Sequence, residues 1–257
     1  MPPRSATADA GAKTPPVPPA RRKARPARRL VWVFVLTCFA LFVFAIALLA
    51  TAPARSLARA VSLPPQLAGL SGGLWQGRAH LEGGLALDWT LVPAELLRGR
   101  LAADLVLSGP ASLARGRLAA GANGAVRLTG LDGRLGPDAL ALAGSGADLS
   151  CVLTTGLHGV RITHGPGGAS AGGRISVTDG TCNRPGATTM QVPAGTVTLG
   201  TSGARATASF AADTAPDTPL AGLALGAERI DLRVEPEGAA LVPGLPRGGP
   251  IELQYPL

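Results

Sequence analysis

The sequence predicts a mainly β protein in which a single N-terminal transmembrane helix is followed by an antiparallel meander. An uncharged run of 23 residues follows a basic tail. Farther along, apolar and polar residues alternate in many short stretches, Gly (35) and Pro (23) are frequent, and aromatic residues make up only 4% of the chain. These features are typical of short strands joined by tight turns. The meander can form a curved sheet, a sandwich or an open barrel.

The N-terminal tail, residues 1–29, holds most of the positive charge. It has eight basic residues and one acidic residue, whereas the rest of the chain has sixteen and fifteen, so the formal net charge of +8 belongs mainly to the tail. A segment this rich in Pro, Ala and Arg cannot bury enough apolar surface to order itself, so we expect it to be disordered. This distribution excludes nucleic-acid binding by the rest of the chain and favours a topology signal, with contact to anionic membrane lipid as the alternative.

The uncharged run at residues 30–52 predicts the transmembrane helix. Its 23 residues reach roughly 34 Å as a helix, enough for a hydrocarbon core of about 30 Å. The basic residues before it place the tail in the cytoplasm and the C-terminal domain in the periplasm, so we expect a single-pass protein of the cell inner membrane. A cleaved signal peptide is the alternative, but its apolar region is shorter, at about 7 to 15 residues.

The exported domain, residues 69–257, follows a linker at 53–68 and is expected to begin with a hairpin. Apolar and polar residues alternate on both sides of Gly83-Gly84, a pair that tolerates the positive φ of a tight turn. A helical turn is expected at 93–99. Further strands are expected at 101–107, 111–119, 125–129, 140–143, 149–154, 159–163, 174–178, 196–199, 204–211 and 228–235, and loops at 213–222 and 243–250.

The two cysteines of the exported domain, Cys151 and Cys182, are expected to form a disulfide in the oxidising periplasm. A Cys2His2 metal site with His158 and His164 is the alternative. It lacks the closely spaced cysteine pair that structural zinc sites favour, so we expect no metal.

Catalytic motifs are scarce. Gly168-Ala-Ser170-Ala-Gly172 matches the G-x-S-x-G nucleophile elbow, but the elbow requires a turn from a strand into a helix, and here a strand-like stretch follows. In a chain with 35 glycines such a match is expected by chance. We therefore expect neither an enzyme nor a cofactor, and a hydrolase that uses Ser170 is a minor alternative.

The start of the exported domain carries a Gly-x-hydrophobic-Trp-x-Gly pattern in segment 70–79, a hydrophobic-x-Trp-x-hydrophobic-x-Pro pattern in 87–93 and a Leu-Leu-x-Gly-like pattern in 96–101. In these patterns it resembles protein N of the general secretion pathway, the type II secretion system. The residues that carry the likeness are Gly73, Trp75, Gly77, Trp89, Pro93 and Gly99. The order of tail, single span and periplasmic domain is also similar.

This resemblance implies a non-enzymatic accessory or assembly component of the type II secretion machinery. Its expected partners are subunits of the inner-membrane platform, the secretin or both, and a homo-oligomer is left open. The alternative is a single-span periplasmic protein that handles lipid or lipopolysaccharide in a greasy groove of a curved sheet. We expect Trp75 and Trp89 to be core residues, with exposed docking anchors as the alternative.

Overall fold

The computed structural model describes residues 32, 34–41, 43–44, 67–144, 150–185, 189–242, 244–246 and 248–256. The chain divides into two compact units, Met1–Leu48 and Leu49–Leu257. In the first unit the described residues are all helical. No helix among the described residues is both long enough and apolar enough to cross a membrane. The predicted tail, the predicted linker up to residue 66 and much of the predicted span lie outside the described residues.

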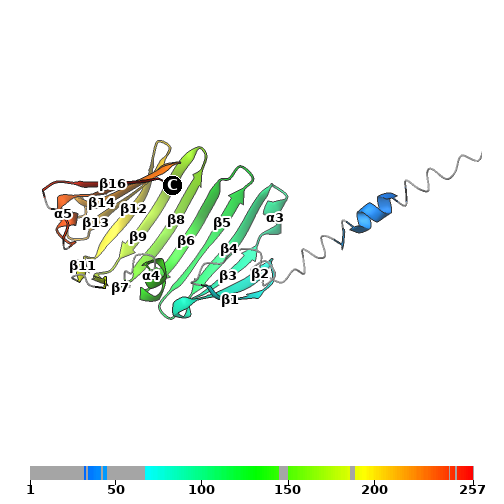
Figure 1. Ribbon diagram of the computed structural model, residues 1–257, viewed down its shortest axis with the longest axis horizontal. Helices are drawn as coiled ribbons and strands as arrows, with labels where there is room; N and C mark the ends of the chain where they lie inside the picture. Colours follow the sequence, from blue (N-terminus) through cyan, green and yellow to red (C-terminus); the bar gives the residue numbers. More distant parts are fainter. Residues whose placement is uncertain are drawn as a thin grey trace, which may run out of the picture. The chain divides into compact units, whose positions relative to one another are not determined.

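The second unit is built on one antiparallel sheet of thirteen strands (Figure 1). Their order in the sheet follows their order in the chain, so each strand pairs with those before and after it. The strands are β1 (Leu67–Gly72), β2 (Gln76–Leu81), β3 (Ala86–Leu91), β4 (Arg100–Ser108), β5 (Leu113–Gly121), β6 (Val126–Leu135), β8 (Thr155–Gly165), β9 (Gly168–Val177), β12 (Gly195–Ser202), β13 (Arg205–Ala212), β14 (Pro219–Leu225), β15 (Arg229–Val234) and β16 (Ile251–Pro256). Of the predicted architectures, the structure shows the curved sheet.

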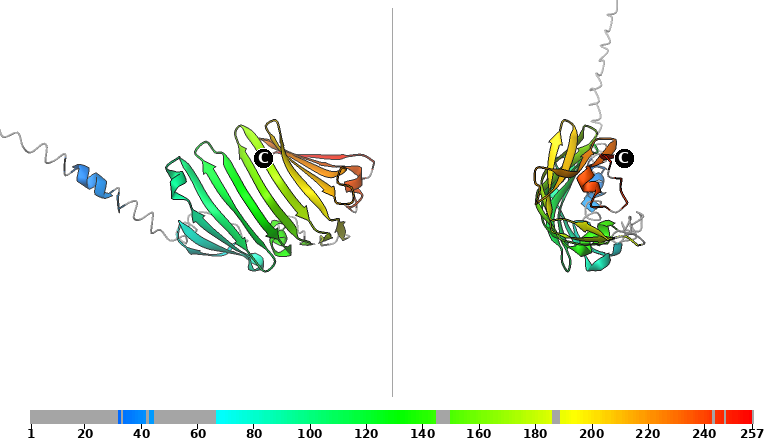
Figure 2. Two further views of the ribbon diagram at one scale, coloured as in Figure 1. Left: turned by 180° about the vertical axis from the view of Figure 1, so that it is seen from behind. Right: turned by 90° about the vertical axis from the view of Figure 1, so that its left-hand side faces the viewer.

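Smaller elements lie in the connections. Three strands, β7 (Ser150–Val152), β10 (Gly180–Asn183) and β11 (Met190–Val192), form a second sheet in the order β11-β10-β7. The helices are η1 (Glu82–Gly84), α3 (Pro93–Leu96), α4 (Pro137–Gly144) and α5 (Pro236–Ala239). Viewed along the domain, the large sheet is strongly curved, and α5 lies inside the curve (Figure 2).

Bulges in the central strands account for part of the curvature. The pairing register shifts between β5 and β6, between β6 and β8 and between β8 and β9. Gly130 and Gly159 lie at two of these shifts with φ of 59° and 58°, a conformation in which a side chain would be strained. An extra residue bends its strand and increases the local twist, so the bulges curve the middle of the sheet.

The structure corrects the predicted strand at 140–143, which is part of α4. Pro137 suits the first turn of a helix, and Asp138 anchors that turn to the β4–β5 loop. The Asp138 carboxylate accepts hydrogen bonds from Ser112 Oγ (2.5 Å) and from the Ala111 backbone N–H (3.2 Å). Burial raises the pKa of Asp138, but these hydrogen bonds and those from nearby backbone N–H groups outweigh it, so the pKa lies below its ordinary value.

Other boundaries also differ from the prediction. β1 begins at Leu67, two residues before the predicted start of the domain. The predicted loop at 213–222 includes the start of β14. β1, β10, β11, β14 and β16 were not predicted as strands, whereas the helical turn at 93–99 is present as α3.

Candidate functional site

One row of apolar residues crosses the whole sheet. Directly opposed residues of antiparallel strands point to the same face, and each of the thirteen strands contributes one residue to this row. The row runs Leu70, Ala79, Leu87, Leu107, Ala114, Gly133, Leu157, Ile175, Val197, Phe210, Ala221, Val234, Ile251. We call the side of the sheet that carries this row the apolar face and the other side the polar face.

The apolar face carries no Asp, Glu, Lys or Arg on any of the thirteen strands. The core cluster of Ala114, Leu157 and Val160 lies on it. So do the four aromatic residues that follow residue 67, namely Trp75, Trp89, Phe210 and Tyr255. The sheet is therefore amphipathic along its whole length.

The apolar face lies on the inside of the curve. A Cβ on Gly238 of α5 would lie 3.3 Å from Val234 Cγ1, so α5 covers the end of the apolar row. Figure 2 shows α5 on the hollow side of the sheet. Elsewhere on this face burial varies: Leu157 is buried in the core cluster, whereas Leu118 and Leu223 have exposed fractions of 38% and 39%.

The polar face carries cross-strand ion pairs. Arg78 Nε donates to Asp88 Oδ1 and Arg117 Nε to Asp104 Oδ1, each at 2.6 Å. Hydrogen bonding from the guanidinium lowers the pKa of both carboxyl groups. Near the C-terminus Arg205 pairs with Asp231 and Arg233 with Glu252, and these residues line a cavity of ≈ 470 Å³.

The middle of the polar face carries an excess of positive charge. Six arginines of the strands β4 to β9 form no ion pair with any described residue. They are Arg100, Arg115, Arg127, Arg134, Arg161 and Arg174, and all six are exposed. Exposed charge of one sign attracts acidic surfaces over a distance of about 10 Å at moderate salt.

The two tryptophans of the predicted motif lie at the β2–β3 end of the apolar face, and both are half-buried. Trp89 is directly opposite Gly77, and its ring occupies the space that a side chain at Gly77 would need. Trp89 Nε1 donates to the Leu74 carbonyl at 3.1 Å, whereas the buried Trp75 Nε1 has no partner among the described residues. Whether either indole also docks a partner stays a prediction.

The remaining motif residues shape the turns beside the tryptophans. The Gly73 backbone N–H donates to the Gln76 carbonyl at 2.8 Å and closes the β1–β2 turn. Pro93 is the first residue of α3, and Gly99 follows that helix with a φ of 69°. We therefore assign these three residues a role in shaping the backbone of the turns.

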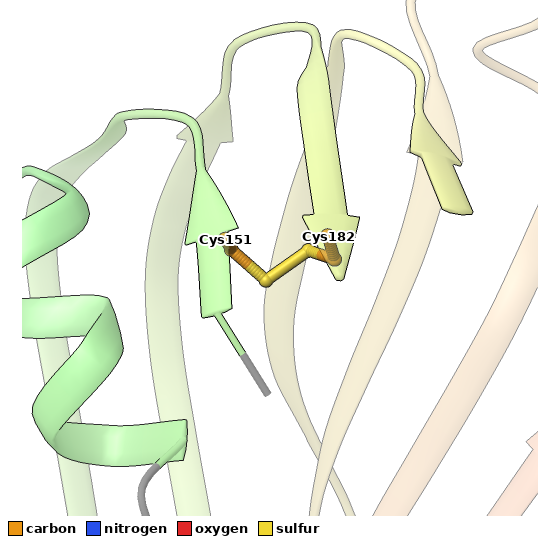
Figure 3. The surroundings of a disulfide bond; sticks show 2 residues. All are labelled: Cys151 and Cys182. Atoms are coloured by element: carbon orange, nitrogen blue, oxygen red, sulfur yellow. A yellow bond between two sulfur atoms is a disulfide. The ribbon is translucent and has the colours of Figure 1, made fainter. Parts of the chain in front are cut away.

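The predicted disulfide is confirmed. Cys151 and Cys182 are directly opposed on β7 and β10, with an S–S distance of 2.02 Å, and they tie the small sheet together (Figure 3). Because both sulfurs are bonded to each other, the alternative Cys2His2 site is wrong. The sheet also separates its two histidines, since His158 lies on the polar face and His164 on the apolar face.

The G-x-S-x-G match lies inside a strand. Ser170 is an exposed residue of β9, directly opposite Thr163 of β8, and the strand runs on to Val177. A nucleophile elbow needs a sharp turn into a helix, so this segment lacks the geometry that would activate the serine.

Sequence reasoning missed the continuity of the apolar face beyond residue 110. A signal for its last strand was present, because Ile251, Leu253 and Tyr255 alternate with Glu252 and Gln254. The pairing partners of the strands, which put one apolar residue of each in a single row, became visible only with the register.

The fold defines a β domain whose large curved sheet has an apolar hollow side and a charged outer side. A sequence model of the family described as "Type II secretion system (T2SS), protein N" matches residues 65–227. This is more than half of the 257 residues, so the chain belongs to that family and takes part in type II secretion. The predicted resemblance is confirmed and extends well beyond residue 101. No curated protein and no solved structure matches the chain.

Proposed function

We propose that this protein is a non-enzymatic, bitopic accessory component of the type II secretion machinery in the inner membrane. Its tail would lie in the cytoplasm and its β domain in the periplasm. Membership of the family supports a role in the secretion machinery, and the uncharged run at 30–52 supports a membrane anchor. The disulfide supports a location in an oxidising compartment.

The exposed edge of β16 supports a role in assembly. β16 ends the sheet and pairs with β15 alone among the described strands, and its residues from Glu252 to Pro256 are all exposed. An unpaired edge presents a row of backbone N–H and C=O groups to which a strand of another protein can add. We infer that a platform or secretin subunit extends the sheet at β16.

Site-specific photocrosslinking in cells tests this role. A photoreactive amino acid at Gln254 of β16 should give an adduct with a secretin or platform subunit. The matched control is Thr198, which is also exposed but lies on β12 inside the sheet, with a strand on either side. Adducts that are the same at both positions, or none at Gln254, would rule out the edge as the docking surface.

The proposed topology is tested separately. Alkaline phosphatase, which is active only outside the cytoplasm, should be active when fused after residue 256 and inactive when fused after residue 29. Activity in neither fusion would contradict the proposed export of the β domain.

The second candidate function is lipid handling, and the apolar face is the observation that favours it. A soluble monomer rarely exposes a large continuous apolar surface without a binding partner. The two candidates are compatible, since one uses the sheet edge and the other the hollow side.

A further inference from the structure

We propose that the apolar face binds the acyl chains of a diacyl phospholipid. This inference rests on the proposed function, because it requires the β domain to be held on the periplasmic side of the inner membrane. It goes further by assigning a surface and a class of ligand.

The chemistry of the face suits hydrocarbon chains. The row of thirteen residues is apolar throughout, and at about 4.8 Å between strands it extends for roughly 58 Å along the curve. The polar side chains on this face are few; they are Thr155, His164, Thr201 and the hydroxyl of Tyr255. An acyl chain offers no hydrogen-bonding group and needs none in return.

A protein partner fits the middle of this face less well. The centres of protein interfaces are enriched in aromatic residues, Met and Arg, which anchor the partner. Between β4 and β12 the apolar face offers almost only Leu, Ile, Val, Ala and Gly, and its aromatic residues lie at the two ends of the sheet. The central surface is therefore suited to a flexible ligand that requires only apolar contact.

Only a short segment of chain joins the proposed membrane anchor to the β domain. Only the fourteen residues 53–66 separate the predicted span from β1, and even a fully extended chain of this length reaches about 50 Å. Trp75 and Trp89 lie on the apolar face at this end, and tryptophan favours the boundary between lipid headgroups and water. The end of the face that is nearest in sequence to the predicted span thus has the side chains expected where a lipid enters.

Photocrosslinking of the full-length protein in cells grown with radiolabelled phosphate tests the proposal. The photoreactive residue replaces Leu118 or Leu223 on the apolar face, and Val106 or Leu113 on the polar face as controls. Leu118 and Val106 form a matched pair, because their exposed fractions are 38% and 39% and they lie on neighbouring strands. After irradiation the protein is purified under denaturing conditions, and its adducts are identified by mass spectrometry.

We expect phospholipid adducts at Leu118 and Leu223 and at least about tenfold less at Val106 and Leu113, the ratio that 1.4 kcal/mol of preference gives. Equal labelling of both faces, no label at the apolar positions, lipopolysaccharide adducts or a crosslinked protein there would each overturn the proposal. Membrane fractionation of the same cells and the Gln254 crosslink test the proposed function separately. Failure of the lipid proposal can therefore be distinguished from failure of the proposed function.

A second measurement covers variants that disturb folding. Leu118→Glu and Val106→Glu introduce the same charge on opposite faces, and only the first should lower the phospholipid that copurifies with the detergent-extracted protein, by about tenfold. If Leu118→Glu does not fold, the crosslinking result decides. Equal copurification with two folded variants would contradict the assigned face.

Discussion

The ring of Trp89 lies across Gly77, the residue directly opposite it on β2, and fills the space where a side chain would project. Gly77→Ala should therefore force the ring or the strand to move and destabilise the domain by about 1 to 3 kcal/mol. Thermal unfolding followed by circular dichroism measures the loss. Gly69→Ala on β1 is the control, because no atom lies within 4 Å of its Cβ position. An equal effect of both substitutions would mean that strand propensity, and not the Trp89 contact, is responsible.

The two indoles should respond differently to replacement by phenylalanine. Trp89→Phe removes the hydrogen bond from Nε1 to the Leu74 carbonyl, which should cost about 1 kcal/mol beyond the change in packing. Trp75→Phe removes a buried N–H that has no partner among the described residues, so its effect on the free energy of unfolding should be smaller. Chemical denaturation of both variants gives the comparison, and a larger loss for Trp75→Phe would contradict this assignment.

Loss of the disulfide should loosen the small sheet first. The bond closes a loop with a sequence separation of 31, and the loop-entropy relation assigns such a bridge about 3 to 4 kcal/mol. In a Cys151→Ser/Cys182→Ser variant, hydrogen exchange should speed up in β7, β10 and β11, whereas the central strands β5, β6, β8 and β9 of the large sheet keep their protection. Cys38→Ser is the control for the loss of a thiol, and uniform deprotection of the whole sheet would contradict a local role.

The carboxylate of Asp138 should make stability depend on pH. Its pKa is lowered in the folded protein, because hydrogen bonds from Ser112 and from backbone N–H groups outweigh the effect of burial. The stabilisation is complete above the unfolded value of about 3.9 and is lost as the pH falls through the folded-state pKa. Asp138→Asn should therefore destabilise at neutral pH, by about 1 to 3 kcal/mol, and the difference from the wild type should shrink in acid.

Urea unfolding at several pH values checks this dependence. Asp213→Asn is a suitable control, since that exposed side chain makes no hydrogen bond or ion pair with the described residues. A constant difference between wild type and Asp138→Asn across the acid range would show that the charge of Asp138 does not matter.

The positions of the strands could be predicted from the sequence more accurately than their pairing. Alternation is a local signal, so the hairpin around Gly83-Gly84 and most strands up to β13 could be predicted from a few residues each. The α4 segment was mistaken for a strand because its Ala and Leu residues have no distinctive period, and the decisive contact between Asp138 and Ser112 spans 26 residues. A contact between residues so far apart in the sequence produces no pattern within a short stretch of neighbouring residues.

The candidate functional surfaces could likewise be predicted only where a local sequence signal marks them. The tryptophan motif and the cysteine pair could be found from residue type and spacing, whereas the apolar face depends on the register of all thirteen strands. A shift of one residue in any strand would turn its apolar side chains to the other face. The bulges at Gly130 and Gly159 keep the apolar residues of β6 and β8 on the same face along each strand. No simple sequence pattern predicts these bulges.

The sequential order of the strands has a consequence for how the domain can be made. Every strand of the large sheet after β1 pairs with a strand that precedes it in the chain. If the β domain is exported with its N-terminal end first, as the proposed topology requires, each strand can add to a finished edge without waiting for distant sequence, except where the small sheet interrupts between β9 and β12. Folding can thus keep pace with translocation, and the last edge to be completed is β16, the same edge that we propose receives a partner.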